Sequence, residues 1–532
     1  MTTSSALLNR LAELNEVGIA LSKVRDTEQL LAQILSAAMR ITNADAGTLY
    51  TRTAADTLAF KMMRTTSLNL ALGGLGEPPI SLPSIALYDE SGLPNEQMVV
   101  SHAVLHDATV NIADAYQADG FDFSGTRAFD AITGYRSQSF LTVPLKNHEN
   151  DIIGVLQLIN AQDFTTQAVC IFDTAAQQLV ESLASQAAIA WTNQLLINQL
   201  EQLFESLIKL INTAIDEKSP HTGQHCARVP ELTMRLAEAV HHSDAPELAG
   251  FRMSERDRYE LKIAGLLHDC GKITTPVHVV DKATKLHTLF DRIELIDTRF
   301  EVLKRDAKIA YLQAGEQNSA AKQQYQQQLA QIDADKCFLH QVNRGAESMA
   351  DADMLRVQQI ANIVWQDTQG NLTTFLTTNE LENLTIRRGT LTASERQVIN
   401  EHITTTINML NSLPWPKHLK NVPEYAGGHH ERMDGKGYPR GLLGSQMPIQ
   451  ARIMAIADIF EALTARDRPY KQGNTLSEAL HMLGRMCLNG HIDPDLFDVF
   501  IRAKVYLQYA EQFLEAYQID AVDEAMIPGY VA

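Results

Sequence analysis

The feature that most restricts the fold is a long run of apolar residues at helical spacing in the first half of the chain. Between residues 176 and 211, apolar side chains recur at alternating steps of three and four, for example at Leu196, Leu200, Leu203 and Leu207. This spacing is typical of a coiled-coil seam or a long connecting helix. The alternative is a single surface helix packed on its own domain, because the run contains only a few heptads.

The residues before this helix combine two periodicities. Apolar positions between residues 5 and 40 have helical spacing and predict amphipathic helices. The segments "AGTLYT", "SFLTVPLK" and "DIIGVLQLIN" are rich in β-branched and aromatic residues and predict strands, with "NHEND" as a turn between the last two. Helices combined with mixed strands predict an α+β domain at residues 1–190.

The residues after the connecting helix predict a second, all-α domain at residues 212–510, because nearly every segment there has helical periodicity. Two or more domains are expected, since one hydrophobic core stops growing near roughly 250–300 residues. A helical insertion at about residues 286–390 interrupts the second domain, and its Gln-rich composition predicts a solvated arm that is not catalytic. Residues 511–532 are predicted to form a C-terminal tail.

Charge and cysteine usage exclude several classes of protein. The 64 acidic and 45 basic residues give a net charge of -19, which repels a phosphate backbone, so a nucleic-acid polymer is not an expected partner. The five cysteines form no CxxC pair, which argues against a zinc ribbon and a disulfide framework. No stretch approaches 18 consecutive apolar residues, so we expect no membrane span and a cytoplasmic location.

Histidines and carboxylates recur in the predicted helical domain in combinations that suit a metal. Imidazole and carboxylate ligands without cysteine suit iron, manganese, nickel or zinc. A single histidine such as His402 is more often a core or surface residue than a ligand. Asp458 lies in an apolar helix, where an unpaired carboxylate is costly, and this favours a nearby cation. The alternative is an ion pair with Arg452, although a spacing of six positions does not place both residues on one helix face.

Two motifs carry a resemblance to a known family. "LLHDCGK" at residues 266–272 resembles the signature of HD phosphohydrolases, and "HHERMDGKGYP" at residues 429–439 resembles the extended signature of their HD-GYP branch. The flanking segments "HTGQHCARV", "RGTLTASERQVINEH", "ARIMAIADIFEAL" and "DRPYK" occur in the order typical of that branch. The resemblance implies an all-α, metal-dependent phosphodiesterase that opens cyclic di-GMP to pGpG and in many members continues to GMP.

The resemblance also implies a centre of two divalent metal ions, with Fe or Mn expected and Ni or Zn as alternatives. The residues that match metal ligands are His225, His268, Asp269, His402, His429, His430 and Asp458. His221 stands where some members have a glutamate that helps to hold a third metal, so it is an extra candidate ligand and two ions are expected. Asp269 matches the bridging carboxylate and Lys272 matches the lysine that meets the scissile phosphate, so both are predicted to be catalytic.

Further residues match substrate contacts. Arg468 and Lys471 of "DRPYK" resemble substrate-binding residues, and Arg432 and Lys436 are predicted to complete a basic pocket with them. Gly437 and Tyr438 of the GYP turn are predicted to contact substrate, with support of the loop as the alternative. Two metal ions can activate water and neutralise the phosphate charge, so no protein nucleophile is required.

Two rival functions remain open at the level of sequence. Activity on cyclic GMP-AMP, which has the same phosphodiester and differs in one base, is the alternative within the enzyme class. A catalytically silent HD-GYP protein that binds a ligand or a protein partner is the alternative from another class. The complete set of candidate ligands argues against a silent site.

The first domain carries a separate resemblance. "FDAITGYRSQSFLTVPLKNHENDIIGVLQLIN" at residues 129–160 resembles a GAF domain of the cyclic-nucleotide-binding kind found beside phosphodiesterase domains. This implies a sensory domain that regulates the phosphodiesterase and binds a small-molecule ligand. In that family a lysine follows the asparagine, whereas here Ala161 follows Asn160, so a GAF fold used only for dimerisation and signal relay is the alternative. The connecting helix predicts a homodimer.

The insertion departs from the HD-GYP pattern, in which the corresponding segments follow each other almost directly. It is expected to cover the site, to contribute dimer contacts or to bind a partner, and the sequence does not select among these. If the arm is peripheral, deletion of residues 290–385 is expected to leave the metal content intact.

Overall fold

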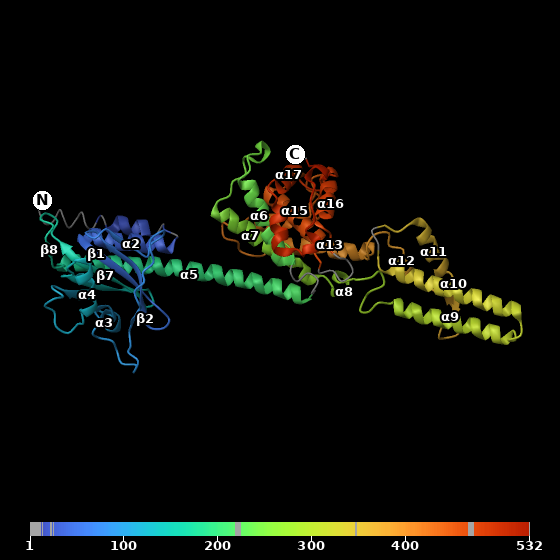
Figure 1. Ribbon diagram of the computed structural model, residues 1–532, viewed down its shortest axis with the longest axis horizontal. Coiled ribbons are helices and arrows are strands. Elements are labelled where there is room, and N and C mark those ends of the chain that lie inside the picture. The colour runs from blue at the N-terminus through green and yellow to red at the C-terminus, as the bar shows by residue number, and fades with distance from the viewer. Residues whose placement is uncertain are drawn as a thin grey trace. The chain divides into compact units, whose positions relative to one another are not determined.

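The chain folds into two compact units, Met1–Phe204 and Glu205–Ala532, in the computed structural model. The model describes residues 12, 14–21, 24, 26–218, 225–345, 348–466 and 473–530. The first unit contains a β-sheet and the second is almost entirely helical (Figure 1). The predicted fold class, an α+β domain, a long connecting helix and a helical domain with a helical insertion, is confirmed. Among the described residues, no helix is both long and apolar enough to cross a membrane.

The sheet of the first unit is antiparallel and has the strand order β3-β2-β1-β7-β6-β5. Its strands are β1 (Ala44–Arg52), β2 (Thr57–Thr65), β3 (Leu70–Leu72), β5 (Val110–Ile112), β6 (Phe140–Lys146) and β7 (Ile152–Gln162). Two short strands flank it, β4 (Ile85–Ala86) beside β2 and β8 (Val169–Cys170) beside β7. The three predicted strands lie in β1, β6 and β7, whereas the sequence analysis did not identify β2.

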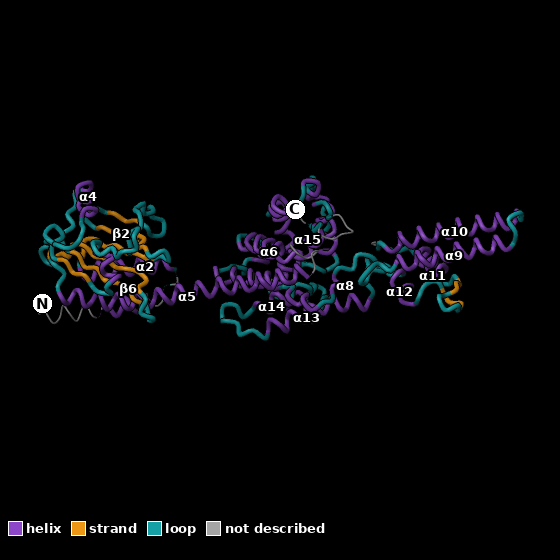
Figure 2. Tube along the Cα trace, turned by 90° about the horizontal axis from the view of Figure 1, so that it is seen from below, coloured by secondary structure: helices purple, strands orange, loops and turns teal. Residues whose placement is uncertain are grey.

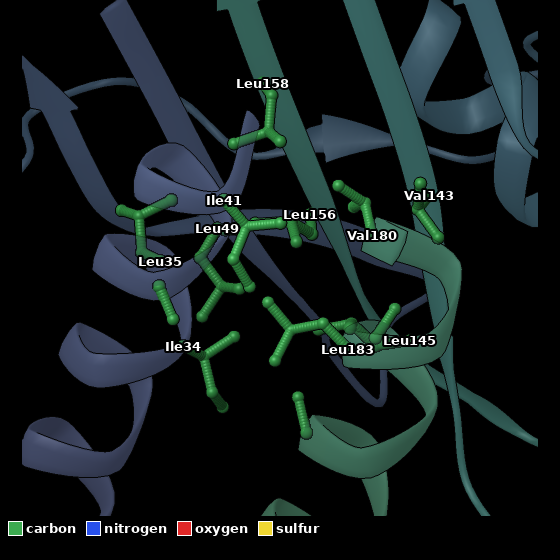
Figure 3. Close-up of a cluster of buried hydrophobic side chains, with 14 of the residues drawn as sticks. Ile34, Leu35, Ile41, Leu49, Val143, Leu145, Leu156, Leu158, Val180 and Leu183 are labelled. Atoms are coloured by element: carbon green, nitrogen blue, oxygen red, sulfur yellow. The ribbon is translucent and has the colours of Figure 1, made fainter. Parts of the chain in front are cut away.

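Helices cover both faces of this sheet. Successive residues of a strand point to opposite sides, so each central strand contributes side chains to both layers. On one face, α2 (Thr27–Thr42) and the start of α5 (Thr174–Lys218) bury their apolar sides. Figure 3 shows this core, where side chains of both helices meet those of the central strands, including Ile34, Leu35, Leu49, Leu156 and Leu183. The neighbouring strand residues Tyr50 and Val155 face the other side and pack against α3 (Val99–Leu105). The helix α4 (Ser124–Thr133) follows in the same unit.

The connecting helix α5 is longer than the predicted 176–211 at both ends. Its first part packs on its own domain, where Val180, Leu183 and Ala187 are fully buried. After Trp191 the apolar stripe turns to solvent, and Leu200 and Leu203 are 67% and 57% exposed. The first part of α5 is therefore a helix packed on its own domain. The part after Trp191 carries an exposed apolar stripe.

The helices of the second unit surround α15 (Ile449–Thr464), which is buried along most of its length. The other helices of this bundle are α6 (His225–His241), α7 (Glu255–Leu267), α8 (Val277–Val280), α13 (Ala393–Asn411), α14 (Val422–Gly427), α16 (Leu476–Leu488), α17 (Pro494–Arg502) and α18 (Val505–Phe513). The chain after α18 packs on the bundle, since Gln518 donates to the carbonyls of Thr464 and Asn474 at 2.8 and 3.0 Å. The described part of the predicted C-terminal tail is therefore a packed part of this unit.

The insertion is a subdomain with its own core. It consists of α9 (Ile293–Gln313), α10 (Ser319–Asn343), α11 (Asp351–Ala361), the strands β9 (Val364–Gln366) and β10 (Leu372–Thr374), and α12 (Thr378–Leu384). The long helices α9 and α10 lie within the predicted helical insertion, whereas the two-stranded hairpin, visible in Figure 2, was not predicted. Its hydrophobic cluster extends from Leu286 to Leu384 in sequence and includes the fully buried Phe300 and Phe375.

Candidate metal centre

The second unit brings all seven predicted metal ligands together. They come from five helices and the turns beside them: His225 begins α6, His268 ends α7, Asp269 follows it, His402 lies in α13, His429 and His430 follow α14, and Asp458 lies in α15. Residues more than 230 positions apart therefore share one site. His221, Arg468 and Lys471, which the sequence also suggests, lie outside the described residues.

The first group of ligand atoms gathers around one carboxylate oxygen of Asp269. His225, His268 and Asp269 each offer one donor atom, and these atoms lie within 4.8 Å of one another. The Nε2 atoms of His225 and His268 are 3.1 and 3.3 Å from Oδ2 of Asp269. Oδ1 of Asp458 is 3.1 Å from Nε2 of His225. Two imidazoles and two carboxylates thus form a set of nitrogen and oxygen donors that suits a divalent transition metal.

The second group gathers around the other oxygen of the same carboxylate. His402, His429 and His430 offer donor atoms that also lie within 4.8 Å of one another. Nε2 of His402 is 3.2 Å from Oδ1 of Asp269. The two oxygens of Asp269 therefore face different groups of histidines.

Hydrogen bonds fix the orientation of three of the histidine rings. The Nδ1–H groups of His268, His402 and His429 donate to the carbonyl oxygens three residues earlier, those of Gly265, Ile399 and Ala426, at 2.7, 2.5 and 2.6 Å. Each ring therefore presents the unprotonated Nε2 atom to the centre. A metal-ligating histidine is held in this way when a carbonyl or carboxylate binds its other ring nitrogen.

Buried acceptor atoms without partners indicate that a cation fits here. Oδ1 of Asp269 and the Nε2 atoms of His402 and His429 are buried and accept no hydrogen bond from any described residue. The Nε2 atoms of His225 and His268 are only 3.4 Å apart. Buried polar atoms almost always have a partner, so unpartnered acceptors aimed at one point fit bound cations.

Electrostatics keep the aspartates ionised and a central imidazole neutral. Burial alone would raise the pKa of Asp269, but the charge of Lys272 leads the interactions that outweigh burial and hold this pKa well below its usual value. Burial lowers the pKa of His429 to about 4. Burial opposes protonation of His225, yet Glu461, Asp269 and Asp458 outweigh it and raise the pKa of this imidazole. A metal ion would take the place of that proton.

Lys272 lies on the exposed side of the centre. Its Nζ atom is 2.5 Å from Oδ2 of Asp269, and its side chain is 23% exposed. Burial opposes its charge, but Asp269 and Asp458 outweigh burial and raise the pKa of Lys272, so the amine stays positive. Asp458 and His225 are likewise partly exposed, whereas His268 and His402 are buried. An anionic group that reaches the centre from solvent therefore meets Lys272.

A glycine allows the turn after Asp269 to lie directly on α13. A Cβ atom on Gly271 would lie 2.0 Å from the carbonyl oxygen of His402 and 2.6 Å from the backbone nitrogen of Thr406. The Gly271 N–H donates to Oγ1 of Thr406 at 2.9 Å. Because α13 touches backbone here, any larger residue would push away the helix that carries His402.

The GYP turn lies against the second group. The Tyr438 ring stacks on the His430 ring with centroids 4.8 Å apart, and the Tyr438 N–H donates to the His430 carbonyl at 3.2 Å. A Cβ atom on Gly437 would lie 2.4 Å from the Arg432 nitrogen, so the close approach of two backbone segments requires glycine. The buried Glu431 carboxylate accepts the N–H groups of Arg440 and Leu442, both at 2.8 Å. The backbone of this turn is therefore held by the His430 carbonyl and by the buried Glu431 carboxylate.

The two predicted basic residues before this turn have different surroundings. Arg432 donates to both carboxylate oxygens of Asp434, at 3.0 and 2.8 Å. Lys436 is 79% exposed, and its Nζ atom lies 3.6 Å from Asp434. Arg432 is thus committed to a partner within the loop, while Lys436 is accessible to an anionic ligand.

The ion pair considered as an alternative for Asp458 is not formed. Arg452 donates to Asp493 instead, with Nη1 and Oδ2 2.5 Å apart. Asp458 faces His225 and His268. The carboxylate in this apolar helix therefore lies in the cluster of candidate ligands.

Glu461 and Arg228, two residues that support His225, were not predicted from the sequence. The buried Glu461 carboxylate lies 2.5 Å from Nδ1 of His225 through Oε2, and its Oε1 accepts from Nε of Arg228 at 2.7 Å. Glu461 follows Asp458 by three positions in α15, which places both carboxylates on one helix face. That spacing was the signal available in the sequence.

Replacement of Glu461 by glutamine is expected to weaken metal binding. The carboxylate uses one oxygen for each of its two donors, whereas an amide has one oxygen, so either His225 or Arg228 loses its acceptor at residue 461. Loss of such an outer partner typically costs roughly 10- to 100-fold in metal affinity. Metal titration followed by elemental analysis measures this, with Glu424→Gln as the control, because Glu424 pairs with Arg440 at the surface. Equal affinities in both variants would contradict the assignment.

Comparison with known protein families gives three matches. The GAF domain family matches residues 26–191, and two HD domain families match residues 222–337 and 374–496. Together the HD matches contain all seven candidate ligands. HD domains are metal-dependent, and the described residues include two groups of suitable donors, one of two histidines and Asp269 and one of three histidines.

Individual relatives match shorter segments. The chain is 47% identical over 81 residues to 3'3'-cGAMP-specific phosphodiesterase 1 of Vibrio cholerae, covering 15% of this chain and 19% of the relative. It is 45% identical over 75 residues to a cyclic di-GMP phosphodiesterase of Pseudomonas aeruginosa, covering 14% and 17%. It is 34% identical over 160 residues to a probable cyclic di-GMP phosphodiesterase of Vibrio cholerae, covering 28% and 33%. The chain thus spans a third or less of the length of these relatives. It contains a GAF domain at residues 26–191 and an HD domain matched over residues 222–337 and 374–496.

Proposed function

We propose that this chain is a phosphodiesterase of the HD-GYP branch that hydrolyses cyclic di-GMP to pGpG, with GMP as a further product. The observation that carries the proposal is the position of Asp269, whose two oxygens face two separate groups of histidines with Lys272 beside them. The relatives named as cyclic di-GMP phosphodiesterases support it.

We propose two divalent ions, Fe or Mn, with Ni or Zn as alternatives. His225, His268, Asp269 and Asp458 would hold one ion, and His402, His429, His430 and the second oxygen of Asp269 would hold the other. When bound, such a pair lowers the pKa of water and neutralises phosphate charge. His221, outside the described residues, is an additional candidate ligand.

The chain's own residues would position the phosphodiester. Lys272 would donate to a non-bridging phosphate oxygen and stabilise the charge that grows there in the transition state. Tyr438 would keep His430 in place through ring stacking, and Gly437 would allow the turn that presents Tyr438. The exposed Lys436, together with Arg468 and Lys471, would bind the anionic dinucleotide, while Arg432 would hold the loop through Asp434. Water is the nucleophile, so no side chain forms a covalent bond to phosphorus.

Cyclic GMP-AMP is the second candidate substrate, because three of the relatives are named for that activity. Full-length protein purified without oxygen should be incubated with each cyclic dinucleotide and the products separated by chromatography. We expect pGpG from cyclic di-GMP at a higher kcat/KM than any turnover of cyclic GMP-AMP. A higher kcat/KM for cyclic GMP-AMP would make that dinucleotide the assigned substrate. If metal-loaded protein hydrolyses neither dinucleotide, the proposed phosphodiesterase activity is wrong.

The GAF domain is proposed to regulate this activity, with a small-molecule ligand as the first candidate signal. Its interior polar groups already bond to protein: Oδ1 of Asn160 accepts from the Gln138 N–H at 2.7 Å, and the buried Asp130 accepts from the Ser137 N–H and hydroxyl, both at 2.8 Å. A ligand that enters there must replace these bonds. Signal relay without a ligand is therefore the second candidate.

A homodimer through α5 is part of the proposal. Leu196, Leu200 and Leu203 continue a seam of heptad spacing and are 49%, 67% and 57% exposed. Asn193, one step earlier in the same seam, is a polar residue of the kind that sets register in two-stranded coiled coils. Light scattering should give the mass of two chains for the wild type and of one chain for Leu200→Glu/Leu203→Glu. A wild-type mass of one chain would contradict the dimer.

A cytoplasmic location is also proposed. All five cysteines are free, as expected for a chain kept in a reducing compartment.

A further inference from the structure

Two lysines are buried where the insertion leaves the helical bundle. Lys282 and Lys285 are each 2% exposed, although lysine is almost never fully buried unless it is paired. Both lie between α8 and α9, at the start of the insertion. Their ammonium groups therefore need partners within the protein, and those partners show what the insertion is attached to.

Lys282 joins the end of the insertion to the helix that carries His402. Its Nζ atom lies 2.7 and 2.8 Å from the two carboxylate oxygens of Glu395, in the first turn of α13. The same Nζ donates to Oδ1 of Asn383, in α12 of the insertion, at 2.7 Å. One ammonium thus connects the segment before the insertion, the last helix of the insertion and α13.

Glu395 also fixes where α13 begins. Its carboxylate accepts the Thr392 N–H at 2.8 Å, while Oγ1 of Thr392 accepts the Glu395 N–H at 3.2 Å, which is a capping box. His402 follows Glu395 by seven positions, two turns along the same helix face. The position of Glu395 therefore determines the position of His402 along its helix axis.

Lys285 ties the remaining parts of the insertion to the same junction. Its Nζ donates to the Leu384 carbonyl at 3.0 Å, and its N–H donates to the Asn343 carbonyl, at the end of α10, at 2.8 Å. Burial lowers the pKa of Lys285 to about 8. Buried hydrogen bonds of Lys282 and Lys285 thus hold the two ends of the insertion together.

The metal centre depends on α13 through two contacts. Nε2 of His402 is 3.2 Å from Asp269, and Gly271 touches the backbone of α13 in the turn that carries Lys272. A shift of α13 would therefore displace a ligand of the second group and the turn that follows the shared carboxylate.

We infer that Lys282 is a positioning residue for the metal centre, and that the insertion acts on this centre through the Lys282–Glu395–Asn383 junction. The inference rests on the proposed metal-dependent function. It revises the sequence expectation of a peripheral arm: deletion of residues 290–385 removes Asn383 and the Leu384 carbonyl, so metal binding is expected to weaken.

A double-mutant cycle on the full chain tests this inference, using Lys282→Met, Glu395→Gln and the double variant. Loss of one partner leaves a buried charge without compensation, whereas removal of both charges is far less disruptive. We expect Lys282→Met to lower the metal affinity by about tenfold or more, an effect typical of residues that orient metal ligands. The double variant is expected to regain much of this affinity. Lys304→Met is the control, because Lys304 pairs with Asp333 within the insertion, away from α13.

Metal per chain, measured by elemental analysis during metal titration, is the deciding readout, and thermal unfolding is recorded in parallel. A Lys282→Met chain that unfolds at lower temperature but keeps the wild-type metal affinity would show a purely structural role and overturn the inference. If Lys282→Met does not fold, Asn383→Ala replaces it, since this change removes the contact from the insertion to Lys282 and leaves the Lys282–Glu395 pair in place. Unchanged metal affinity in Asn383→Ala would also overturn the inference. Wild-type protein that binds two ions without hydrolysing cyclic di-GMP would reject the proposed function alone.

Discussion

Replacement of Asp269 by asparagine is expected to remove both metal ions and to abolish phosphodiesterase turnover. Each oxygen of this carboxylate faces a different group of histidines, and an amide has only one oxygen to offer. The amide nitrogen would point its hydrogens at the second group. The loss of metal affinity should exceed the roughly 10- to 100-fold cost of losing an outer partner. Lys272 would also lose the carboxylate that lies 2.5 Å from its Nζ atom.

Elemental analysis and turnover of cyclic di-GMP, both on protein purified without oxygen, measure this effect. Asp335→Asn is the matched control, because Asp335 is also buried but pairs with Arg356 in the insertion. That variant should keep two ions per chain and wild-type turnover. Two bound ions in Asp269→Asn, or full activity, would contradict the assignment of Asp269 as the shared ligand.

Replacement of Lys272 by methionine is expected to lower kcat while the metal ions stay bound. Lys272 ligates no metal in this account and contributes only a positive charge on the exposed side of the centre. Removal of one preorganised group that stabilises transition-state charge typically costs about 10²- to 10³-fold in kcat. The two carboxylates that raise the pKa of Lys272 would remain available to the metals.

Steady-state kinetics and metal analysis together separate binding from catalysis for this variant. Lys436→Met serves as the control, since Lys436 is exposed and lies on the loop. It should raise KM for cyclic di-GMP with little change in kcat. A Lys272→Met chain with wild-type kcat and a raised KM would place Lys272 in substrate binding alone.

The candidate ligands were implied by the resemblance to HD-GYP proteins, because they lie in short motifs that can be matched residue by residue. His268 and Asp269 are adjacent, as are His429 and His430, so each pair needs only one helix end to be placed correctly. Strands β1, β6 and β7 were predicted because their segments are rich in β-branched and aromatic residues. Asp458 stood out because an apolar helix offers no local partner for a carboxylate.

The supporting residues could not be predicted in the same way, because their partners are set by tertiary packing. Lys282 and Glu395 are separated by the whole insertion, and nothing in either local sequence indicates that the two side chains meet in a buried pair. The Gln-rich composition of the exposed helical hairpin concealed a packed core around Phe300 and Phe375. Glu461 was accessible in principle, since its spacing from Asp458 places it on the same face of α15.

Asp269 and the six candidate ligands around it are proposed to hold two divalent cations. Anomalous X-ray diffraction from crystals of the full chain, collected at the absorption edges of manganese, iron, nickel and zinc, tests this most directly. We expect two anomalous peaks, one beside His225, His268 and Asp458 and one beside His402, His429 and His430, with Asp269 between them. Crystals of fully active protein with no anomalous peak among these residues would contradict it.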